Sequence, residues 1–570
     1  MKTIKSLILS TIVSTALLFP AIAAAQEIRP LLTITAQNFD RMVEASMHIQ
    51  RAIEPKKPLD LRQEFLSQAG NPDGVGLDSS RPWHFSFWFS GIGMPTYSVL
   101  YVPVADFEAF KDALKPGKNF KGFHNNNIIR KDGKYAVIIN RPKKDFEIPE
   151  AVTKAAVQLR RTLPKTIGTV FQLNLGIDEN MRKLLLGGLQ MGRGMLQMQM
   201  ANPKGKAQNA ATPFDALADV FGLYFDVAAL IVKGVENLQL NVDIDRQQIT
   251  TTTRLDAVDG SELATMLAPT KANLNRFAPY LNNDSAMVFV GHVRGSEFTR
   301  GLIAKAMAVS AKLQGGDGGE KASKQMNEIM GKLLPMTFAG SFDMGPGFRI
   351  SGIYEFPDNK ANDIHEEFGG LMESMTQIQV GKDGLYSSFK REKAARKVKG
   401  ATVDIVTTTI NTNSAMLKLP GQLEAFRIMW PEDKITYEFA TKGRRIFYSM
   451  GEPIEVAMAK AKSPAKLRVS INKNTFVAGR YNILALMKTW MPQNPMMPKE
   501  IMGPIGKLDH KDTGIDLKAD IDGQLSSQTV VPLKLLTQFS RFGKEIAKGR
   551  QKAKPAEVVP APPEAKRSNN

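Results

Sequence analysis

The sequence of 570 residues contains no cysteine. Disulfides, thiolate nucleophiles, zinc–cysteine sites, iron–sulfur clusters and covalently attached haem are therefore excluded. Histidine is scarce, with six residues, and His365 lacks a second histidine four positions later. The zincin pattern is thus absent, and a lone surface histidine is expected. No apolar run reaches 18 residues, so the sequence predicts no transmembrane segment in the mature chain.

Sequence motifs of known catalytic mechanisms are missing as well. There is neither a Gly-x-Ser-x-Gly elbow nor a Gly-x-x-x-x-Gly-Lys-Ser/Thr loop, and the glycine-rich stretch Gly315–Lys321 is interpreted as a linker. The acidic residues Asp516, Asp520 and Asp522 before Gly523 lack EF-hand spacing, and their alternation with apolar residues predicts a strand and a turn. We expect no catalytic residues, no metal and no cofactor, while the 56 acidic residues leave a carboxylate-dependent hydrolase open.

The first 25 residues have the pattern of a secretory signal peptide. Lys2 and Lys5 precede the apolar run Leu7–Phe19, and Ala23–Ala25 supply the small residues that signal peptidase requires. This run is too short to span a hydrocarbon core of roughly 30 Å as a helix. We expect cleavage before Gln26, export to the periplasm or cell surface, and no lipoprotein anchor, because cysteine is absent.

The order of expected strands and helices predicts an α+β protein. A unit of a short strand, a helix, a β-hairpin and a second helix recurs from Leu31, Thr169, Met287 and Leu467. Because hairpins dominate, the sheets are expected to be mainly antiparallel, with helices on one face. The first and third units share an extension, so we expect two similar halves that arose by duplication.

These patterns divide the chain into segments. They are a signal peptide (1–25), an N-terminal α+β half (26–268), a linker (269–284), a C-terminal α+β half (285–543) and a disordered, basic, Pro-rich tail (544–570). Strands are expected at Met287–Val293, at Leu467–Ile471 and on either side of Arg396. Ala201–Pro213 and Gln314–Ser323 are expected to be loops between helices.

Methionine is frequent, with 27 residues, and gathers in the expected helix Asp178–Met200. Met195, Met198 and Met200 have a spacing that could place three thioether sulfurs on one Cu(I) ion. Met191, Met195 and Met198 also share one helical face, which is typical of a core or of an adaptable apolar contact surface. The sequence favours this second interpretation.

Basic residues exceed acidic ones, 75 to 56, so the formal net charge is +19 and falls to +17 when the signal peptide is removed. The densest cluster consists of Lys390, Arg391, Lys393, Arg396, Lys397 and Lys399. Such clusters attract polyanions, although no nucleic-acid motif accompanies this one. We expect these six residues to bind anionic envelope material; the alternative is a solvated basic face.

Together these features predict an exported, non-catalytic envelope or periplasmic protein. Its expected partner is a lipid headgroup, lipopolysaccharide, a cell-wall polymer or another envelope protein. The alternative is a carrier that holds an amphipathic or lipid-like ligand between the sheet and the Met-rich helices Asp178–Met200 and Phe214–Lys233. A large exposed apolar face would favour the carrier. A secreted hydrolase comes third, and it would require convergent carboxylates with shifted pKa values.

Overall fold

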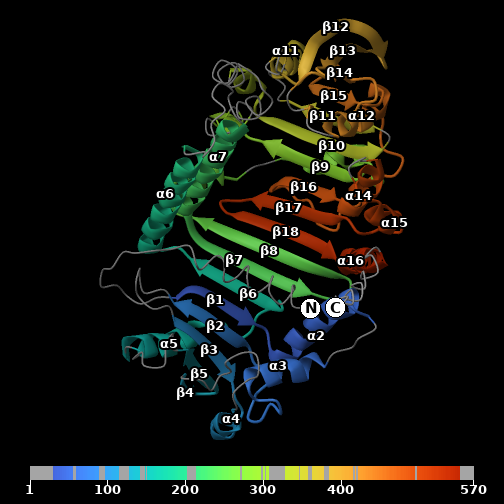
Figure 1. Cartoon of the computed structure of the whole chain (residues 1–570). Coiled ribbons are helices and arrows are strands. Elements are labelled where there is room, and N and C mark those ends of the chain that lie inside the picture. Colours follow the sequence, from blue (N-terminus) through green and yellow to red (C-terminus); the bar gives the residue numbers. More distant parts are fainter. Residues whose placement is uncertain are drawn as a thin grey trace, which may run out of the picture.

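Eighteen strands in the described part of the chain join edge to edge in one antiparallel sheet (Figure 1). The computed structural model describes residues 30–552, except 56–59, 89–96, 115–126, 141–147, 149, 202–212, 270–271, 297–298, 302, 304, 307–327, 346, 357–362, 378–379, 381–383, 415–416, 419–420 and 494–496. The expected signal peptide lies wholly outside the described residues, and the two expected loops lie mainly or wholly outside them. The α+β class and the antiparallel sheet are confirmed.

The strands of residues 30–257 occupy one end of the sheet, and those of residues 287–532 occupy the other. The first group is ordered β4 (Ile128–Asp132), β5 (Tyr135–Asn140), β3 (Tyr97–Pro103), β2 (Trp83–Trp88), β1 (Pro30–Ala36), β6 (Phe171–Gly176), β7 (Val235–Ile244) and β8 (Gln248–Ala257). The second group continues with β18 (Leu525–Pro532), β17 (Ile515–Ile521), β16 (Thr475–Tyr481), β9 (Met287–Val293), β10 (Met336–Gly345), β11 (Gly347–Glu355), β15 (Arg445–Met450), β14 (Lys434–Lys442), β13 (Ala401–Ile410) and β12 (Tyr386–Val398). The groups meet where β8 pairs with β18, so the hydrogen-bonded ladder passes through both.

Helices pack on both faces of the sheet at its β4 end. Helix α5 (Glu150–Thr162) packs on Tyr101 and Val137, whereas α4 (Phe107–Ala113) packs on Val102 and Ile138, which point the other way. Helices α2 (Phe39–Ile53) and α3 (Leu61–Ala69) share a core with Trp83. The strands here are apolar on both faces, so each face needs a cover.

The β12 end is also covered on both faces. Helix α11 (Ile364–Gln377) packs on Val406 and Phe439. The 3₁₀ helix η1 (Leu274–Tyr280) and α13 (Ile454–Ala457) pack on Val403 and Ala440, which face the opposite way. The prediction of helices on one face is therefore wrong at both ends, since neighbouring residues of these strands are buried on alternate sides.

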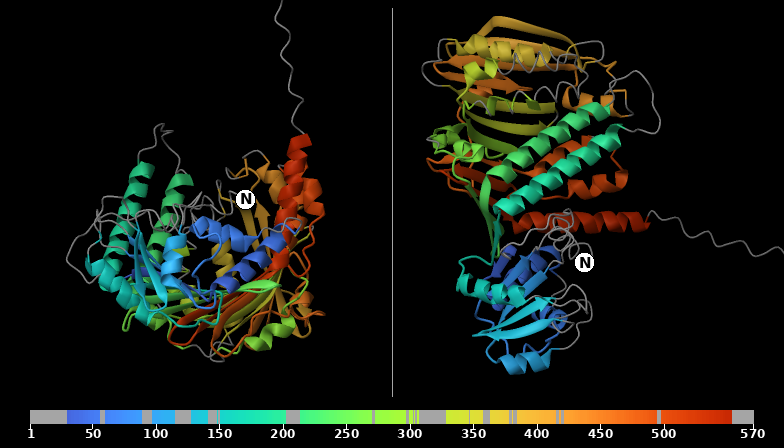
Figure 2. Two further views of the ribbon diagram at one scale, coloured as in Figure 1. Left: turned by 90° about the horizontal axis from the view of Figure 1, so that it is seen from below. Right: turned by 90° about the vertical axis from the view of Figure 1, so that its left-hand side faces the viewer.

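Two rows of helices flank the middle of the sheet (Figures 1 and 2). One row is the hairpin of α6 (Glu179–Ala201) and α7 (Pro213–Gly234), followed by the short α8 (Glu262–Met266). The other row contains α2, α14 (Ile483–Trp490), η3 (Met491–Gln493), α15 (Lys499–Gly506) and α16 (Leu533–Lys552). Helix α12 (Gln422–Met429) lies beside β11. Polar side chains cap several of these helices; for example, Ser261 accepts a hydrogen bond from the Ala264 N–H.

Four sequence expectations need correction. The expected linker contains η1, whose Leu274 and Phe277 are buried. The expected tail begins too early, because the amphipathic α16 continues to Lys552. No strand forms at 467–471; β16 forms instead at Thr475–Tyr481, where Gly479 and Arg480 obscure the apolar alternation. Arg396 lies inside β12 beyond a bulge, not between two strands.

Candidate functional site

The basic segment identified in the sequence forms the edge of the described sheet. Five of its six cations lie on β12, and Lys399 lies in the turn that follows. Cations on an edge strand oppose edge-to-edge pairing with a second sheet. The segment therefore has a structural role that requires no ligand.

Most of these cations have carboxylate partners. The ion pairs are Lys390–Glu392 (2.5 Å), Arg391–Asp404 (2.7 Å), Arg391–Glu366 (3.3 Å), Lys393–Glu366 (2.8 Å), Arg396–Glu438 (2.6 Å) and Arg396–Glu455 (2.5 Å). Lys399 Nζ lies 3.5 Å from the Met458 carbonyl oxygen, and Lys397 has no ion pair among the described residues. The positive charge of this segment is therefore largely balanced within the fold. Polyanion binding by the segment stays a prediction.

Asp404 organises the most buried part of this network. It is 1% exposed and accepts hydrogen bonds from the Ala394 N–H and the Arg391 guanidinium, both at 2.9 Å. Burial alone would raise the pKa of Asp404, but these hydrogen bonds and the nearby His365 hold it below its ordinary value. His365 Nε2 lies 3.1 Å from Asp404, so His365 is not the lone surface histidine expected. The network ties α11 to β12 and β13.

Three arginines surround a second buried carboxylate, Glu355. Arg276, Arg444 and Arg445 approach its oxygens at 2.7, 3.3 and 2.6 Å. Burial lowers the pKa of Arg276, and the two neighbouring guanidinium groups lower it further against the attraction of Glu355. These contacts join η1 to β11 and β15. They do not bring a nucleophile next to a general acid or base.

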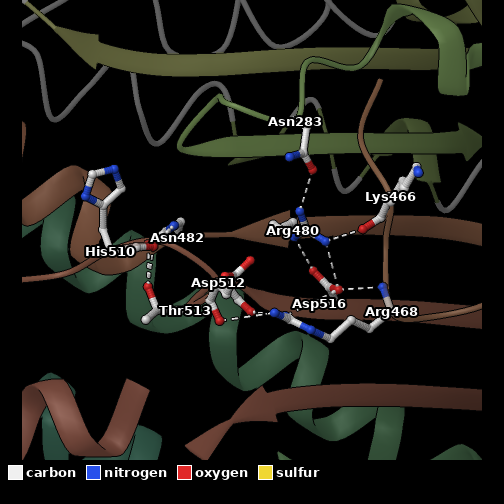
Figure 3. A network of polar contacts seen from close by, with 10 residues as sticks. Asn283, Lys466, Arg468, Arg480, Asn482, His510, Asp512, Thr513 and Asp516 are labelled. Atoms are coloured by element: carbon white, nitrogen blue, oxygen red, sulfur yellow. Dashed lines mark hydrogen bonds and ion pairs between the residues drawn. The ribbon is translucent and has the colours of Figure 1, made fainter. Parts of the chain in front are cut away.

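A third network surrounds Asp516, which is fully buried on β17 (Figure 3). Arg480 donates to it from Nε (2.6 Å) and Nη2 (3.2 Å), and the Arg468 backbone N–H donates at 2.5 Å. The Arg468 guanidinium also donates to the carbonyl oxygens of Gly514 and Asp512. Each Asp516 oxygen is thus satisfied by a donor, which is typical of a structural ion pair.

One pocket with three carboxylates tests the hydrolase alternative. It measures about 700 Å³ and is lined by Glu438, Glu452 and Glu455 together with Arg396. A hydrogen bond from Arg396 lowers the pKa of Glu455, whereas a general acid needs a raised pKa. Among the described aspartates and glutamates, every clearly shifted pKa is lowered.

Within the described residues there is neither a cluster of metal ligands nor a helix that could span a membrane. There, no three His, Asp or Glu side chains come close enough together to ligate a metal. Met195 of the copper alternative is 54% exposed, and the side chains of Met198 and Met200 lie outside the description. None of the described helices has both the length and the apolar character needed to cross a bilayer.

The most extensive unexplained feature is a line of residues that crosses the sheet on one face, here called the apolar row. Register pairs place its members side by side on eleven successive strands: Phe85, Ile34, Leu173, Leu240, Thr253, Ser527, Ala519, Val477, Gly291, Phe338 and Tyr354. All except Gly291 are half-buried. At about 4.8 Å per strand, the row is about 48 Å long.

The opposite face of the middle strands is polar. Opposite-facing neighbours of the row form a second line: Asn174, Gln239, Arg254, Ser526 and Asp520. A two-sided sheet in water normally covers its apolar face and exposes its polar face. In the middle strands both faces are partly exposed, so part of the apolar row is accessible to solvent.

Among the described residues, helices pack on the face beside the row and not on its middle. On one side, Met181 and Leu185 of α6 pack with Leu255. On the other side, Leu535 and Phe539 of α16 pack with Val531. The middle members of the row, Leu173, Leu240, Thr253, Ser527, Ala519 and Val477, join none of the buried clusters of the described residues.

The α6–α7 hairpin stands beside this face of the sheet (Figure 2), and several of its apolar side chains are exposed. Met191 is 46% exposed and Tyr224 is 69% exposed, and Phe221 and Ile231 are also exposed. Flexible methionine side chains adapt to ligands of irregular shape. A large exposed apolar face is the feature expected to distinguish a carrier.

Comparison of the chain with models of protein families, with curated proteins and with solved structures found no match in any of the three.

Proposed function

We propose that the protein is a non-catalytic carrier that holds the acyl chain of an amphipathic, lipid-like ligand along the apolar row. The observation that carries the proposal is the row itself. Its Leu173 and Leu240 are half-exposed, whereas helices cover the strands at both ends of the sheet. Folded proteins seldom leave large apolar patches uncovered unless they bind something.

The dimensions of the row favour a chain-like ligand over a compact one. The row is one side chain wide on each strand and about 48 Å long. Thr253 and Ser527 place hydroxyl groups at its centre, where they can contact a polar group of an amphipath. Flanking helices with flexible methionines would close around such a ligand from the side.

The order of strand pairings supports the further proposal that the sheet arose by duplication. In the N-terminal group the strands run β2, β1, β6, β7, β8. In the C-terminal group they run β10, β9, β16, β17, β18, which is the same sequence of pairings. Joining two such units at β8 and β18 lengthens one apolar face across both.

Export and polyanion binding are retained as separate proposals. The signal-peptide pattern supports action in the periplasm or at the cell surface, where lipid-like ligands occur. The exposed Lys390, Lys393, Lys397 and Lys399 of the edge segment would then add a salt-sensitive contact with anionic envelope material.

The carrier proposal is tested with a fluorescent fatty acid and with native mass spectrometry of protein purified gently from its envelope fraction. We expect the mature protein to retain an adduct of several hundred daltons and to bind the probe. Leu240→Glu places a carboxylate in the row and should weaken probe binding at least tenfold, because an acyl chain cannot solvate the charge.

Gln239→Glu is the matched control, since it adds the same charge to the polar face of the same strand. Its affinity for the probe should stay within twofold of wild type. Equal weakening by both variants, or a wild-type protein with neither adduct nor probe binding, would refute the proposal. Circular dichroism checks that both variants are folded.

A further inference from the structure

A pocket of about 550 Å³ lies between segments that are far apart in the sequence. It is lined by the C-terminal part of α2, the turn between β7 and β8, the first turn of α16, and Arg468 and Asp512 from the loops before β16 and β17. Its volume is within the range of small-molecule sites. None of its lining residues belongs to the apolar row.

The pocket is strongly cationic. Its charged lining consists of Arg51, Arg246, Arg468 and Lys534 against the single carboxylate Asp512, with His48 as a further titratable group. His48 Nε2 lies 3.6 Å from Glu44, whose carboxylate also pairs with Arg41. The positive side chains of the lining therefore outnumber the carboxylates beside them.

Two of the cations already have partners. Lys534 pairs with Asp509 at 2.8 Å, and Arg468 shares Asp516 with Arg480. Counted with these partners, the site holds five cationic and three anionic side chains, which leaves two positive charges. A phosphate monoester carries a matching charge of about −2 at neutral pH.

Other contacts fix the walls of the pocket before a ligand arrives. Arg468 donates from Nη1 to the Gly514 carbonyl (2.8 Å) and from Nη2 to the Asp512 carbonyl (3.1 Å). The Leu533 N–H donates to the Gln247 carbonyl at 2.7 Å and so ties α16 to the turn between β7 and β8. The N-terminal turn of this 20-residue helix adds a favourable dipole for an anion.

Arg51 and Arg246 are the cations available to a ligand. Both side chains are exposed, and neither has an ion-pair partner in the described part of the chain. The planar guanidinium group can donate two parallel hydrogen bonds to a phosphate, and it remains charged at physiological pH.

From this arrangement we infer that the pocket binds the phosphate group of a phosphorylated ligand, held by Arg51 and Arg246, while the already paired Arg468 and Lys534 add to the positive potential of the pocket. The same chemistry is offered by a free phosphomonoester and by the headgroup of an anionic lipid. The inference is independent of the carrier proposal, because it concerns other residues and another kind of ligand group.

The test uses isothermal titration calorimetry with glycerol 3-phosphate at physiological salt. Flotation with vesicles of phosphatidylcholine, with and without phosphatidic acid, tests the lipid source. The variant Arg51→Gln/Arg246→Gln should weaken binding at least tenfold. The control Arg161→Gln/Arg541→Gln removes the same charge at exposed positions outside the pocket and should bind within twofold of wild type.

Binding of glycerol 3-phosphate supports a free phosphomonoester, and selective binding of phosphatidic acid vesicles supports a headgroup, provided that the pocket variant loses it. No binding of either probe, or equal loss in the control variant, would overturn the inference. Arg51→Lys/Arg246→Lys keeps the charge and should recover part of the affinity, which guards against a folding defect. Binding of the fatty-acid probe should be unchanged in the pocket variant, so this site and the apolar row can fail separately.

Discussion

Mild acid should destabilise the N-terminal end of the sheet through His84. This β2 residue is 3% exposed, lies beside the rings of Tyr101 and Tyr135, and shares a 2.9 Å hydrogen bond with Thr35 Oγ1. Burial, together with the positive charge of Arg160, lowers the pKa of His84 from 6.5 to about 4. Between these values the unfolded chain binds a proton that the folded chain does not, so protonation favours unfolding.

The magnitude follows from the two pKa values. The difference between 6.5 and about 4 corresponds to about 3 kcal/mol in the free energy of unfolding. This stability is present above pH 6.5 and is lost as the pH falls toward 4, with about 2 kcal/mol gone at pH 5. Most carboxylates titrate below this window, so the effect of histidine can be separated from acid denaturation.

The assay is urea-dependent hydrogen exchange of peptides from β2 and β3 at pH 7.5 and pH 5. Between pH 7.5 and pH 5, the free energy of unfolding of these strands should fall by about 2 kcal/mol more in wild type than in His84→Gln. His292→Gln is the control; its pKa is also lowered, by burial and by Arg294 and Arg276, but it lies on β9 and should leave the exchange of β2 unchanged. Identical pH dependence in wild type and His84→Gln would refute the reasoning.

Three smaller predictions concern local packing. Asp516→Ala should lower the free energy of unfolding of β16–β18, measured in urea, by about 3–5 kcal/mol, because Arg480 keeps its buried charge without a partner. A loss below about 1 kcal/mol would contradict the stabilising role of this network. Gly352→Ala should lower the thermal midpoint, because its Cβ would lie 2.5 Å from Tyr448 Oη and 2.6 Å from the Ala339 carbonyl oxygen; Tyr448→Phe should restore only part of it, and full restoration would show that the backbone contact is harmless. Ser261→Ala should destabilise α8 by about 1 kcal/mol, seen as faster amide exchange, with unchanged exchange as the contrary result.

Local features of the fold were predictable from the sequence. The strand Met287–Val293 has the predicted bounds, and the helix expected at Asp178–Met200 corresponds closely to α6. Alternation and turn residues act over a few positions, so hairpins such as the one around Asp522 and Gly523 are encoded locally. The position of β16 could not be predicted from local alternation, because Gly479 and Arg480 interrupt its apolar pattern. Arg480 makes its contact with Asp516 on another strand.

The candidate sites could not be predicted from local sequence patterns in the same way. The basic segment was conspicuous because its charges are consecutive, but its partners Glu438 and Glu455 come from other parts of the chain. The pocket has the opposite property: Arg51, Arg246 and Lys534 are far apart in sequence and form no run. Likewise, no local pattern indicates that Leu173 lies beside Leu240, because pairing order is a long-range property.

The seam between β8 and β18 has a consequence for how the protein folds. Leu255 pairs with Leu525, which lies 270 positions later in the chain. Until the last strands arrive, β8 presents an unpaired edge on an otherwise complete first half, and such edges recruit other chains. The run Thr250–Thr253 gives that edge polar hydroxyls instead of large apolar side chains. We therefore expect chains truncated just before β17 to depend most strongly on chaperones, because the edge of β8 then has no strand to pair with.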